Sequence, residues 1–176
     1  MKRSAIIFLT IILLNGCSSS TQDSGNGDQQ QAKTEVTDTT PRVTGIGGIF
    51  FHSEDPGKIM EWYGQNLGLA IDEFGSPFEF RNANRPDEIN YLRWGPMDKD
   101  SGYFAPSGKE FMINYRVQNI EGLVHQLREN GVTILDEITP YAYGKFVHIL
   151  DPEGNKLELW EPIDSILTQM GGATTK

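Results

Sequence analysis

Apolar side chains follow two different spacings in the first half of the folded part, and each spacing predicts a kind of element. The run Val43–His52 predicts a strand. Asp55 can cap a helix, and Pro56 suits the first turn of that helix. Apolar residues then recur at helical spacing until Gly68 stops the pattern; they are Ile59, Trp62, Tyr63 and Leu67. Three short strands are predicted to follow, over residues 69–74, 78–82 and 89–94.

The second half repeats the same order. Phe111–Val117 alternates as a strand, and Asn119 can cap a helix that stops at Gly131. The apolar residues of this helix are Ile120, Leu123 and Leu127. Strands are predicted over residues 132–138, 145–150 and 156–161, and the last two are joined by the turn Asp151–Asn155. A strand, a helix and three strands, written twice, is an internal repeat and predicts an α+β domain.

The N-terminus has the pattern of an export signal. Lys2 and Arg3 precede a run of apolar residues over 5–14, which is shorter than the roughly 20 residues that span a bilayer. We therefore expect a signal peptide over residues 1–16. The sequence Leu14-Asn15-Gly16-Cys17 resembles a lipobox, and Cys17 is the only cysteine of the chain. The resemblance implies a lipid on Cys17; the alternative is an ordinary signal peptide that happens to contain this cysteine.

Composition divides the rest of the chain. Residues 17–41 are rich in Ser, Thr, Gln, Gly and Asp, so we expect the lipidated cysteine to be followed by a flexible tether. The folded domain is expected over 42–163, with modules at about 43–95 and 110–162 and a C-terminal tail over 164–176. Ser18, rather than an acidic residue, follows the cysteine. We therefore expect residence in the bacterial cell envelope, on the outer membrane if the cell has two membranes.

The net charge of −9 narrows the partners. Nucleic acid is not expected as a partner, because its recognition depends on basic surfaces. A basic face for membrane binding is not expected either. The predicted membrane contact is therefore the lipid on Cys17 alone.

Three stretches of the folded part carry a family resemblance. They are His52–Gly68, Phe111–Val117 and Tyr143–Trp160, and together they cover nearly the whole domain. They resemble the glyoxalase/bleomycin-resistance group of the vicinal oxygen chelate superfamily. The resemblance implies two βαβββ modules that form a cupped mixed sheet around a cleft. It leaves open whether one chain closes the cup or two chains share it as a homodimer.

Strand alternation sorts side chains between the helix face and the cleft face of such a sheet. In the first strand, Gly47, Ile49 and Phe51 are expected on the helix face, and Ile46 and Gly48 in the cleft. The residues expected to contact a ligand in the cleft are Phe50, His52, Tyr91, Arg93, Met112, Asn114, Arg116, Phe146 and Trp160, with Tyr143 at its edge. The segment Asp98–Lys109 could cover the cleft, with Tyr103 and Phe104 at its tip.

The Asp151–Asn155 turn makes a sharper geometric prediction. If these five residues form the loop, His148 lies directly opposite Glu158, and Phe146 lies opposite Trp160. A carboxylate beside an imidazole raises the pKa of the histidine and orients one of its ring nitrogens. His148 and Glu158 are therefore the candidate catalytic pair; the alternative is a structural polar pair between strands.

The family resemblance also implies four metal-ligand positions in the cleft. Laid over this chain, they fall on Gly48, Ile89, Met112 and Glu158. Only Glu158 can ligate a zinc-, nickel- or iron-like ion. We expect neither a classical metal centre nor another cofactor. The alternative is a relocated divalent metal on His52, His148 and Glu158.

Three functions remain open from the sequence. The first is a module that binds a small apolar or aromatic molecule in the cleft. The second is a lyase or isomerase that uses the His148–Glu158 pair for proton transfer, with Asn114 or Arg93 stabilising an oxyanion. The third is a non-catalytic interaction protein whose cleft is filled by side chains or a partner.

Overall fold

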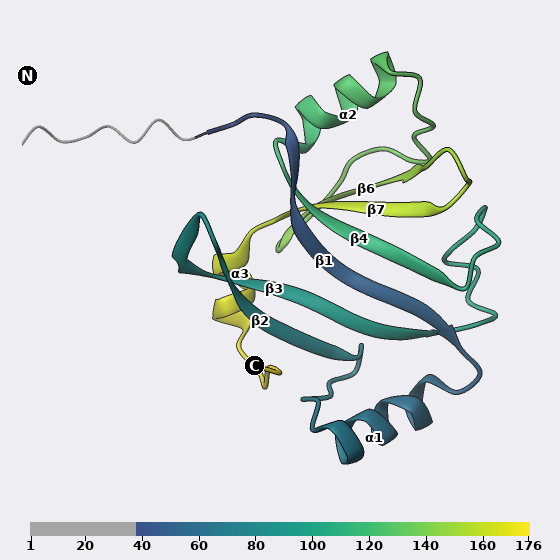
Figure 1. Ribbon diagram of the computed structural model, residues 1–176, viewed down its shortest axis with the longest axis vertical. Coiled ribbons are helices and arrows are strands. Elements are labelled where there is room, and N and C mark those ends of the chain that lie inside the picture. The colour runs from purple at the N-terminus through teal and green to yellow at the C-terminus, as the bar shows by residue number, and fades with distance from the viewer. Residues whose placement is uncertain (1–37) are drawn as a thin grey trace, which may run out of the picture. The chain divides into compact units, whose positions relative to one another are not determined.

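The computed structural model describes residues 38–176, so the predicted signal peptide, Cys17 and most of the tether lie outside the described residues. The chain forms one seven-stranded sheet in the order β2-β3-β1-β4-β7-β6-β5 (Figure 1). The strands are β1 Arg42–Ser53, β2 Ser76–Asn82, β3 Arg85–Asp98, β4 Phe111–Gln118, β5 Thr139–Tyr141, β6 Gly144–Leu150 and β7 Lys156–Pro162. The predicted mixed α+β sheet is therefore confirmed, and β1 joins the two modules by pairing with β4.

Within residues 38–176, three helices accompany the sheet: α1 Pro56–Leu67, α2 Ile120–Glu129 and α3 Asp164–Met170. The predicted caps form, because the Asp55 side chain accepts from the Lys58 amide at 2.9 Å and Gly68 ends α1 with a left-handed φ of 74°. Asn119 caps α2 by accepting from the Gly122 amide at 3.0 Å. No helix in residues 38–176 is long and apolar enough to cross a membrane.

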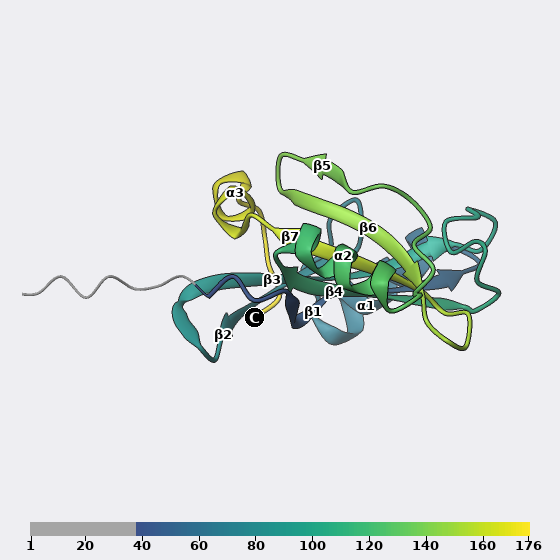
Figure 2. The same cartoon turned by 90° about the horizontal axis from the view of Figure 1, so that it is seen from above.

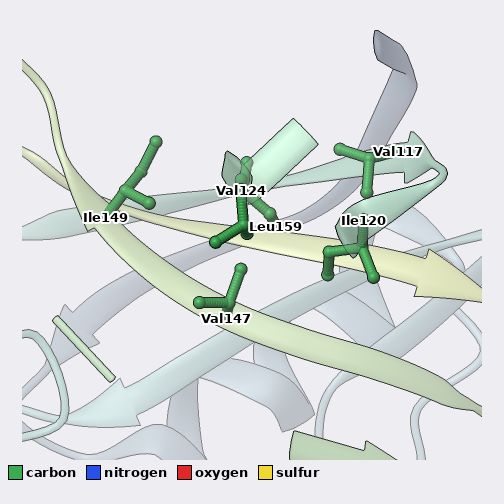
Figure 3. Packing of buried hydrophobic residues seen from close by; sticks show 6 residues of the cluster. All are labelled: Val117, Ile120, Val124, Val147, Ile149 and Leu159. Atoms are coloured by element: carbon green, nitrogen blue, oxygen red, sulfur yellow. The ribbon is translucent and has the colours of Figure 1, made fainter. Parts of the chain in front are cut away.

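The main hydrophobic core lies in the second module. Six buried side chains from α2 and its neighbouring strands pack together there (Figure 3); they are Val117, Ile120, Val124, Val147, Ile149 and Leu159. In the first module, Trp94 of β3 packs against Tyr63 of α1, with ring centroids 4.5 Å apart. Figure 1 shows α1 beside the β2–β3 half of the sheet and α2 beside the other half. Because side chains alternate along a strand, the residues between Val147, Ile149 and Leu159 point to the face away from this core.

Two of the predicted strands are wrong. Residues 69–74 make only a single bridge between Asp72 and Gly75, because the Asp72 side chain caps a tight turn by accepting from the Phe74 amide at 2.8 Å. Residues 132–138 make only the bridge Ile134–Ile149. There the Asp136 carboxylate, rather than a backbone carbonyl, accepts the His148 amide at 2.7 Å, and this side-chain bond interrupts the ladder. The short edge strand β5 follows this segment instead.

The predicted faces of β1 are partly wrong as well. The pairing of β1 with β4 shifts register between Val43 and Gly45 and again between Ile46 and Gly48. Ile46 consequently pairs with Tyr115 on the helix face instead of lying in the cleft. Gly47, expected on the helix face, lines the cleft. A β-bulge adds one residue to one strand, so the simple alternation fails across it.

Both ends of the described chain are tied to the domain. Gln118 Nε2 donates to the carbonyls of Asp38 and Thr40 at 3.0 and 2.7 Å. At the other end, residues 164–176, expected as a tail, form α3 and then return to β2, where Thr175 bridges to Phe78. Figure 2 shows α3 on the same side of the central strands as β5 and β6. Phe146 of β6 and Leu167 and Met170 of α3 line one cavity.

Candidate ligand-binding cleft

One row of paired residues crosses five neighbouring strands on the cleft face. Arg93 of β3 pairs with Gly48 of β1, and Gly48 pairs with Asn114 of β4. Asn114 pairs in turn with Glu158 of β7, and Glu158 with His148 of β6. Residues paired across neighbouring strands point to the same face of a sheet. The predicted placement of His148 opposite Glu158 is therefore confirmed, and the row extends it to three further strands.

Glu158 is the centre of a buried hydrogen-bond network. One of its carboxylate oxygens accepts from Asn114 Nδ2 at 2.6 Å. The other accepts from the Tyr103 hydroxyl at 2.8 Å and lies 3.1 Å from His148 Nε2. Burial raises the pKa of Glu158, but the hydrogen bonds from His148, Asn114 and Tyr103 outweigh burial and leave this pKa below its usual value. The carboxylate is therefore ionised at neutral pH.

His148 lies between two carboxylates. Its Nδ1 is 2.6 Å from Asp136 Oδ2, and its Nε2 faces Glu158. Burial lowers the pKa of His148, but the hydrogen bonds to Glu158 and Asp136 outweigh it, so that the pKa is raised overall. Both ring nitrogens can donate at once only in the charged imidazolium, which this pair of acceptors favours. Asp136 is not among the predicted site residues, because the sequence pattern predicts a strand over residues 132–138.

The connection between the modules covers one side of this network, as its composition suggested. Tyr103 reaches Glu158 with its hydroxyl, and its backbone carbonyl accepts from Lys156 Nζ at 2.7 Å. Burial and the nearby Glu158 charge raise the pKa of the Tyr103 phenol, so that it stays a donor. Phe104 is fully buried and stacks on His52 with centroids 4.2 Å apart. The connection is thus fixed at Tyr103 and Phe104.

His52 does not join the other two site residues. It lies four positions beyond Gly48 on β1, a separation of roughly 13 Å at about 3.3 Å per residue. Its Nδ1 contacts Glu110 at 3.2 Å, and its ring packs under Phe104. The relocated metal site on His52, His148 and Glu158 is therefore not assembled.

Apolar side chains lie beside the row on the cleft face. A cavity of about 370 Å³ lies there, a size typical of small-molecule sites. Its apolar lining residues are Phe50, Phe74, Tyr143, Phe146, Trp160, Leu167 and Met170. Phe146 and Trp160 stack nearly parallel, with centroids 5.7 Å apart, as their predicted pairing requires. Arg93 also lines this cavity while pairing with Asp72 at 2.6 Å.

A smaller compartment continues the cleft on the other side of Glu158. It measures about 240 Å³ and includes His148, Asp136 and Tyr141 in its lining. Tyr143 and Phe146 belong to the walls of both spaces. A larger hollow of about 690 Å³ elsewhere is lined mainly by polar and charged residues. An apolar ligand is better matched by the cleft beside the row.

Three residues expected to contact a ligand do not line the cavity. Met112 is fully buried. Arg116 is 4% exposed. Its guanidinium donates to the Tyr91 carbonyl at 2.9 Å and to the Asp164 carboxylate of α3 at 2.5 Å. The Tyr91 hydroxyl is bonded to Thr168, also of α3, at 3.0 Å. Sequence reasoning placed these side chains on the cleft face but did not include the helix that covers two of them.

Gly47 makes room for the Asn114 side chain. A Cβ atom at this position would lie 2.1 Å from Asn114 Oδ1 and 2.8 Å from Trp160 Cε3. The Asn114 amide is oriented by Glu158, because a carboxylate can only accept, so the nitrogen faces it. Oδ1 is then left buried with no hydrogen-bond partner among the described residues. The glycine is therefore needed for the close approach of this side chain.

The side chains of the row do not fit the metal centre implied by the family resemblance. The residues that share a row with Gly48 are Arg93, Asn114 and Glu158, instead of the expected Ile89 and Met112. A guanidinium and an amide replace the imidazole and carboxylate ligands that zinc or iron would need. Within residues 38–176, no group of three or more His, Cys, Asp or Glu side chains is arranged to hold a metal ion.

Several solved structures of enzymes are similar to this chain. A Streptomyces coelicolor methylmalonyl-CoA epimerase variant in complex with 2-nitronate-propionyl-CoA aligns with a TM-score of 0.51 at 15% identity, covering 69% of this chain and 99% of that one. Methylmalonyl-CoA epimerase from Mycobacterium tuberculosis aligns at 0.48 and 19%, covering 72% and 93%. The Mn(II)-bound glyoxalase from Novosphingobium aromaticivorans aligns at 0.48 and 14%, covering 77% and 42%.

Of these three, the Streptomyces coelicolor structure has a TM-score above 0.5, and at 15% identity its likeness shows the fold alone. None of the curated proteins compared with the chain matches it. The family model described as "Glyoxalase/Bleomycin resistance protein/Dioxygenase superfamily" matches residues 45–159, which include both modules and every residue of the row. The chain belongs to the glyoxalase/bleomycin resistance protein/dioxygenase superfamily.

Proposed function

We propose that this protein binds a small apolar or aromatic molecule in the cleft beside the row, without a classical metal centre. The observation that carries the proposal is that apolar and polar groups line one cavity side by side. The stacked pair Phe146 and Trp160 lines it together with Arg93, Asn114 and Glu158 of the row. Apolar walls with a few oriented polar groups are typical of ligand sites.

The state of the His148–Glu158 pair favours binding over proton transfer. A general base needs a free lone pair and a pKa near the working pH. Both oxygens of Glu158 already accept hydrogen bonds, and its pKa is lowered. His148 has a raised pKa, which favours the protonated ring, and a protonated imidazole has no lone pair with which to accept a proton. The two residues therefore form an ion pair that can orient a ligand bound in the cleft.

We further propose that the domain is held at the bacterial cell envelope by a lipid on Cys17. The support is the lipobox-like sequence that ends at this residue, the only cysteine of the chain. Cells fed a radiolabelled fatty acid should incorporate label into the wild-type chain, and the protein should sediment with membranes. The Cys17→Ala chain should lose both properties. Retention of label in that variant would overturn the anchoring.

Ligand binding can be tested with defined probes, 4-ethylphenol and 4-ethylbenzoate. The full chain is reconstituted in lipid nanodiscs, and titration calorimetry against empty nanodiscs removes the heat of partition into lipid. Phe146→Ala should weaken binding of both probes at least tenfold, because it removes one wall of the cleft. Phe111→Ala is the control, since Phe111 is 45% exposed at the end of β4 and does not line the cavity. Absence of binding in the wild type, or equal binding by Phe146→Ala, would overturn the proposal.

A second candidate function is a lyase or isomerase, favoured by one observation. Asp136 orients the His148 ring through Nδ1, as an acid–base catalyst requires. Such an enzyme would exchange solvent deuterium into a carbon acid such as pyruvate. The exchange would disappear in His148→Gln, while the titration of 4-ethylphenol would persist. If the wild type exchanges deuterium into pyruvate no faster than buffer alone, the enzyme function is overturned and ligand binding stands as the proposed function.

A further inference from the structure

The segment 164–176 is fastened to the sheet at both of its ends. At its start, Asp164 accepts from buried Arg116 and from Asn90 Nδ2, the latter at 3.1 Å. At its far end, the Thr175 amide donates to the Pro77 carbonyl at 2.8 Å, and the Thr175 carbonyl accepts from the Glu79 amide at 3.0 Å. The last residues of the chain are thus added to β2 like a short parallel strand (Figure 1).

The site beside β2 where Thr175 rests, its seat, is formed by Ser76 and Ala70 and depends on the Thr175 hydroxyl. Ser76 is fully buried, and its hydroxyl bonds the Thr175 hydroxyl at 2.8 Å. The same Thr175 oxygen accepts from the Ala70 amide at 2.8 Å. Without Thr175, the Ser76 side chain would lose this partner, and a buried polar group without a partner is costly. The contact therefore defines a closed position of the segment.

Between the two fastenings, α3 depends on the sheet for its stability. It has seven residues, no side-chain cap at its start and no buried residue of its own. A helix this short does not persist in water without tertiary contacts. Its contacts toward the sheet are the Thr168–Tyr91 hydroxyl bond at 3.0 Å and the apolar side chains Leu167 and Met170, which line the cavity.

We propose that residues 164–176 form a movable wall of the cleft. In the closed position, Leu167 and Met170 bound the end of the cavity away from His148 and set the length of the apolar ligand that it accepts. Release of Thr175 from its seat on β2 opens that end. This inference rests on the proposed ligand binding, and it narrows the ligand class to an aromatic ring that carries an apolar chain of limited length.

The length limit is tested with 4-alkylphenols from methyl to octyl, titrated into the full chain in nanodiscs. Affinity for the wild type should rise with each added methylene and then stop rising. The double variant Leu167→Ala, Met170→Ala should raise the affinity ratio of 4-hexylphenol to 4-ethylphenol at least fivefold. Leu67→Ala is the matched control, because Leu67 ends α1, is 59% exposed and does not line the cavity. It should leave the ratio unchanged.

The motion is tested by hydrogen–deuterium exchange. Thr175→Val keeps the shape of the side chain but removes its hydroxyl bonds, so exchange in peptides covering 77–80 and 164–176 should quicken at least fivefold. Peptides covering α2 should be unaffected. Thr133→Val is the control, since Thr133 is exposed and far from the segment in sequence. Added 4-ethylphenol should slow exchange over 164–176 in the wild type.

The outcomes separate the two proposals. If Phe146→Ala abolishes binding but the Leu167 and Met170 changes leave the length ratio unaltered, the wall is overturned while ligand binding stands. If no alkylphenol binds the wild type, both are overturned together. Unchanged exchange over 164–176 in Thr175→Val would refute the opening motion, even if the length ratio responds.

Discussion

His148 and Glu158 face each other across the β6–β7 hairpin, with Nε2 3.1 Å from the carboxylate oxygen. The five-residue turn sets the register that brings them together. Glu158 is 5% exposed, so its carboxylate is buried. A charge this deep is tolerated only when it is paired and hydrogen-bonded. The pair is consequently both a feature of the cleft and a point on which stability depends.

The pH dependence of stability should follow this pair. The pKa of His148 is raised above 6.5, so its contribution is fully present below that value and is lost as the pH rises through the folded-state pKa. The pKa of Glu158 is lowered below 4.5, so its contribution is present above that value and is lost as the pH falls through the folded-state pKa. The combined contribution should be largest between these two values.

Urea unfolding at about pH 5.5 and about pH 8.5 measures this effect as a difference in the free energy of unfolding. The wild type should lose more stability toward the higher pH than His148→Gln does. His125→Gln is the control, because His125 is 73% exposed and pairs only with Glu129 of its own helix. Identical pH profiles for the wild type and His148→Gln would contradict the expectation.

Replacing Glu158 by glutamine should destabilise the fold. The amide keeps the shape but loses the charge, and one of its atoms becomes a donor that faces the donors of Asn114, Tyr103 or His148. We expect a loss of about 3 kcal/mol in the free energy of unfolding. Glu153→Gln, in the exposed hairpin turn, should change stability by less than about 0.5 kcal/mol. Denaturant titration of both variants measures the free energy of unfolding. Equal losses in the two variants would show that the hydrogen-bond network around Glu158 does not stabilise the fold.

Gly47→Ala should disturb the cleft itself. The added methyl would meet Asn114 Oδ1 and Trp160, so either side chain must move. Overpacking of this kind costs about 2 kcal/mol, and 4-ethylphenol binding should weaken with it. At Gly45 of the same strand, a Cβ would make an ordinary contact of 3.8 Å with Arg116. Gly45→Ala should therefore preserve both stability and binding, and an equal loss in the two variants would disprove the specific fit.

Arg116→Lys should loosen α3. The guanidinium bonds the Tyr91 carbonyl and Asp164 at once and lies 5.2 Å from the centre of the Trp160 ring. A lysine ammonium cannot reproduce that planar fork, so we expect a loss of about 2 kcal/mol and faster amide exchange in α3. Arg128→Lys, at an exposed ion pair with Glu137, should cost less than about 0.5 kcal/mol. Undisturbed exchange in Arg116→Lys would show that this clamp does not hold the helix.

Local chemistry made part of the structure predictable from sequence. Asp55 and Gly68 bound α1 through their own side chain and backbone preferences, and neither needs distant residues. The length of the turn Asp151–Asn155 sets the register of the two strands that it joins, so it determines which side chains lie opposite each other. These local features are sufficient to predict the pairing of His148 with Glu158 and of Phe146 with Trp160.

Other residues depended on contacts between distant segments. Asp136 reaches His148 because its carboxylate replaces a backbone acceptor along β6, which no periodicity encodes. The bulge that moves Gly47 into the cleft exists only where β1 and β4 pair. Arg116 and Tyr91 follow their strands as expected, yet α3 returns from the far end of the chain to cover them.

The sequence by itself determined the α+β repeat, the caps, the hairpin register and the apolar character of the cleft, because each follows from spacing within a short stretch of chain. The tertiary structure alone decided which of the cleft-face residues line the cavity. That choice depends on how β1 bulges and on where residues 164–176 come to rest. Both are set by packing between segments far apart in the sequence, where a local pattern carries no information.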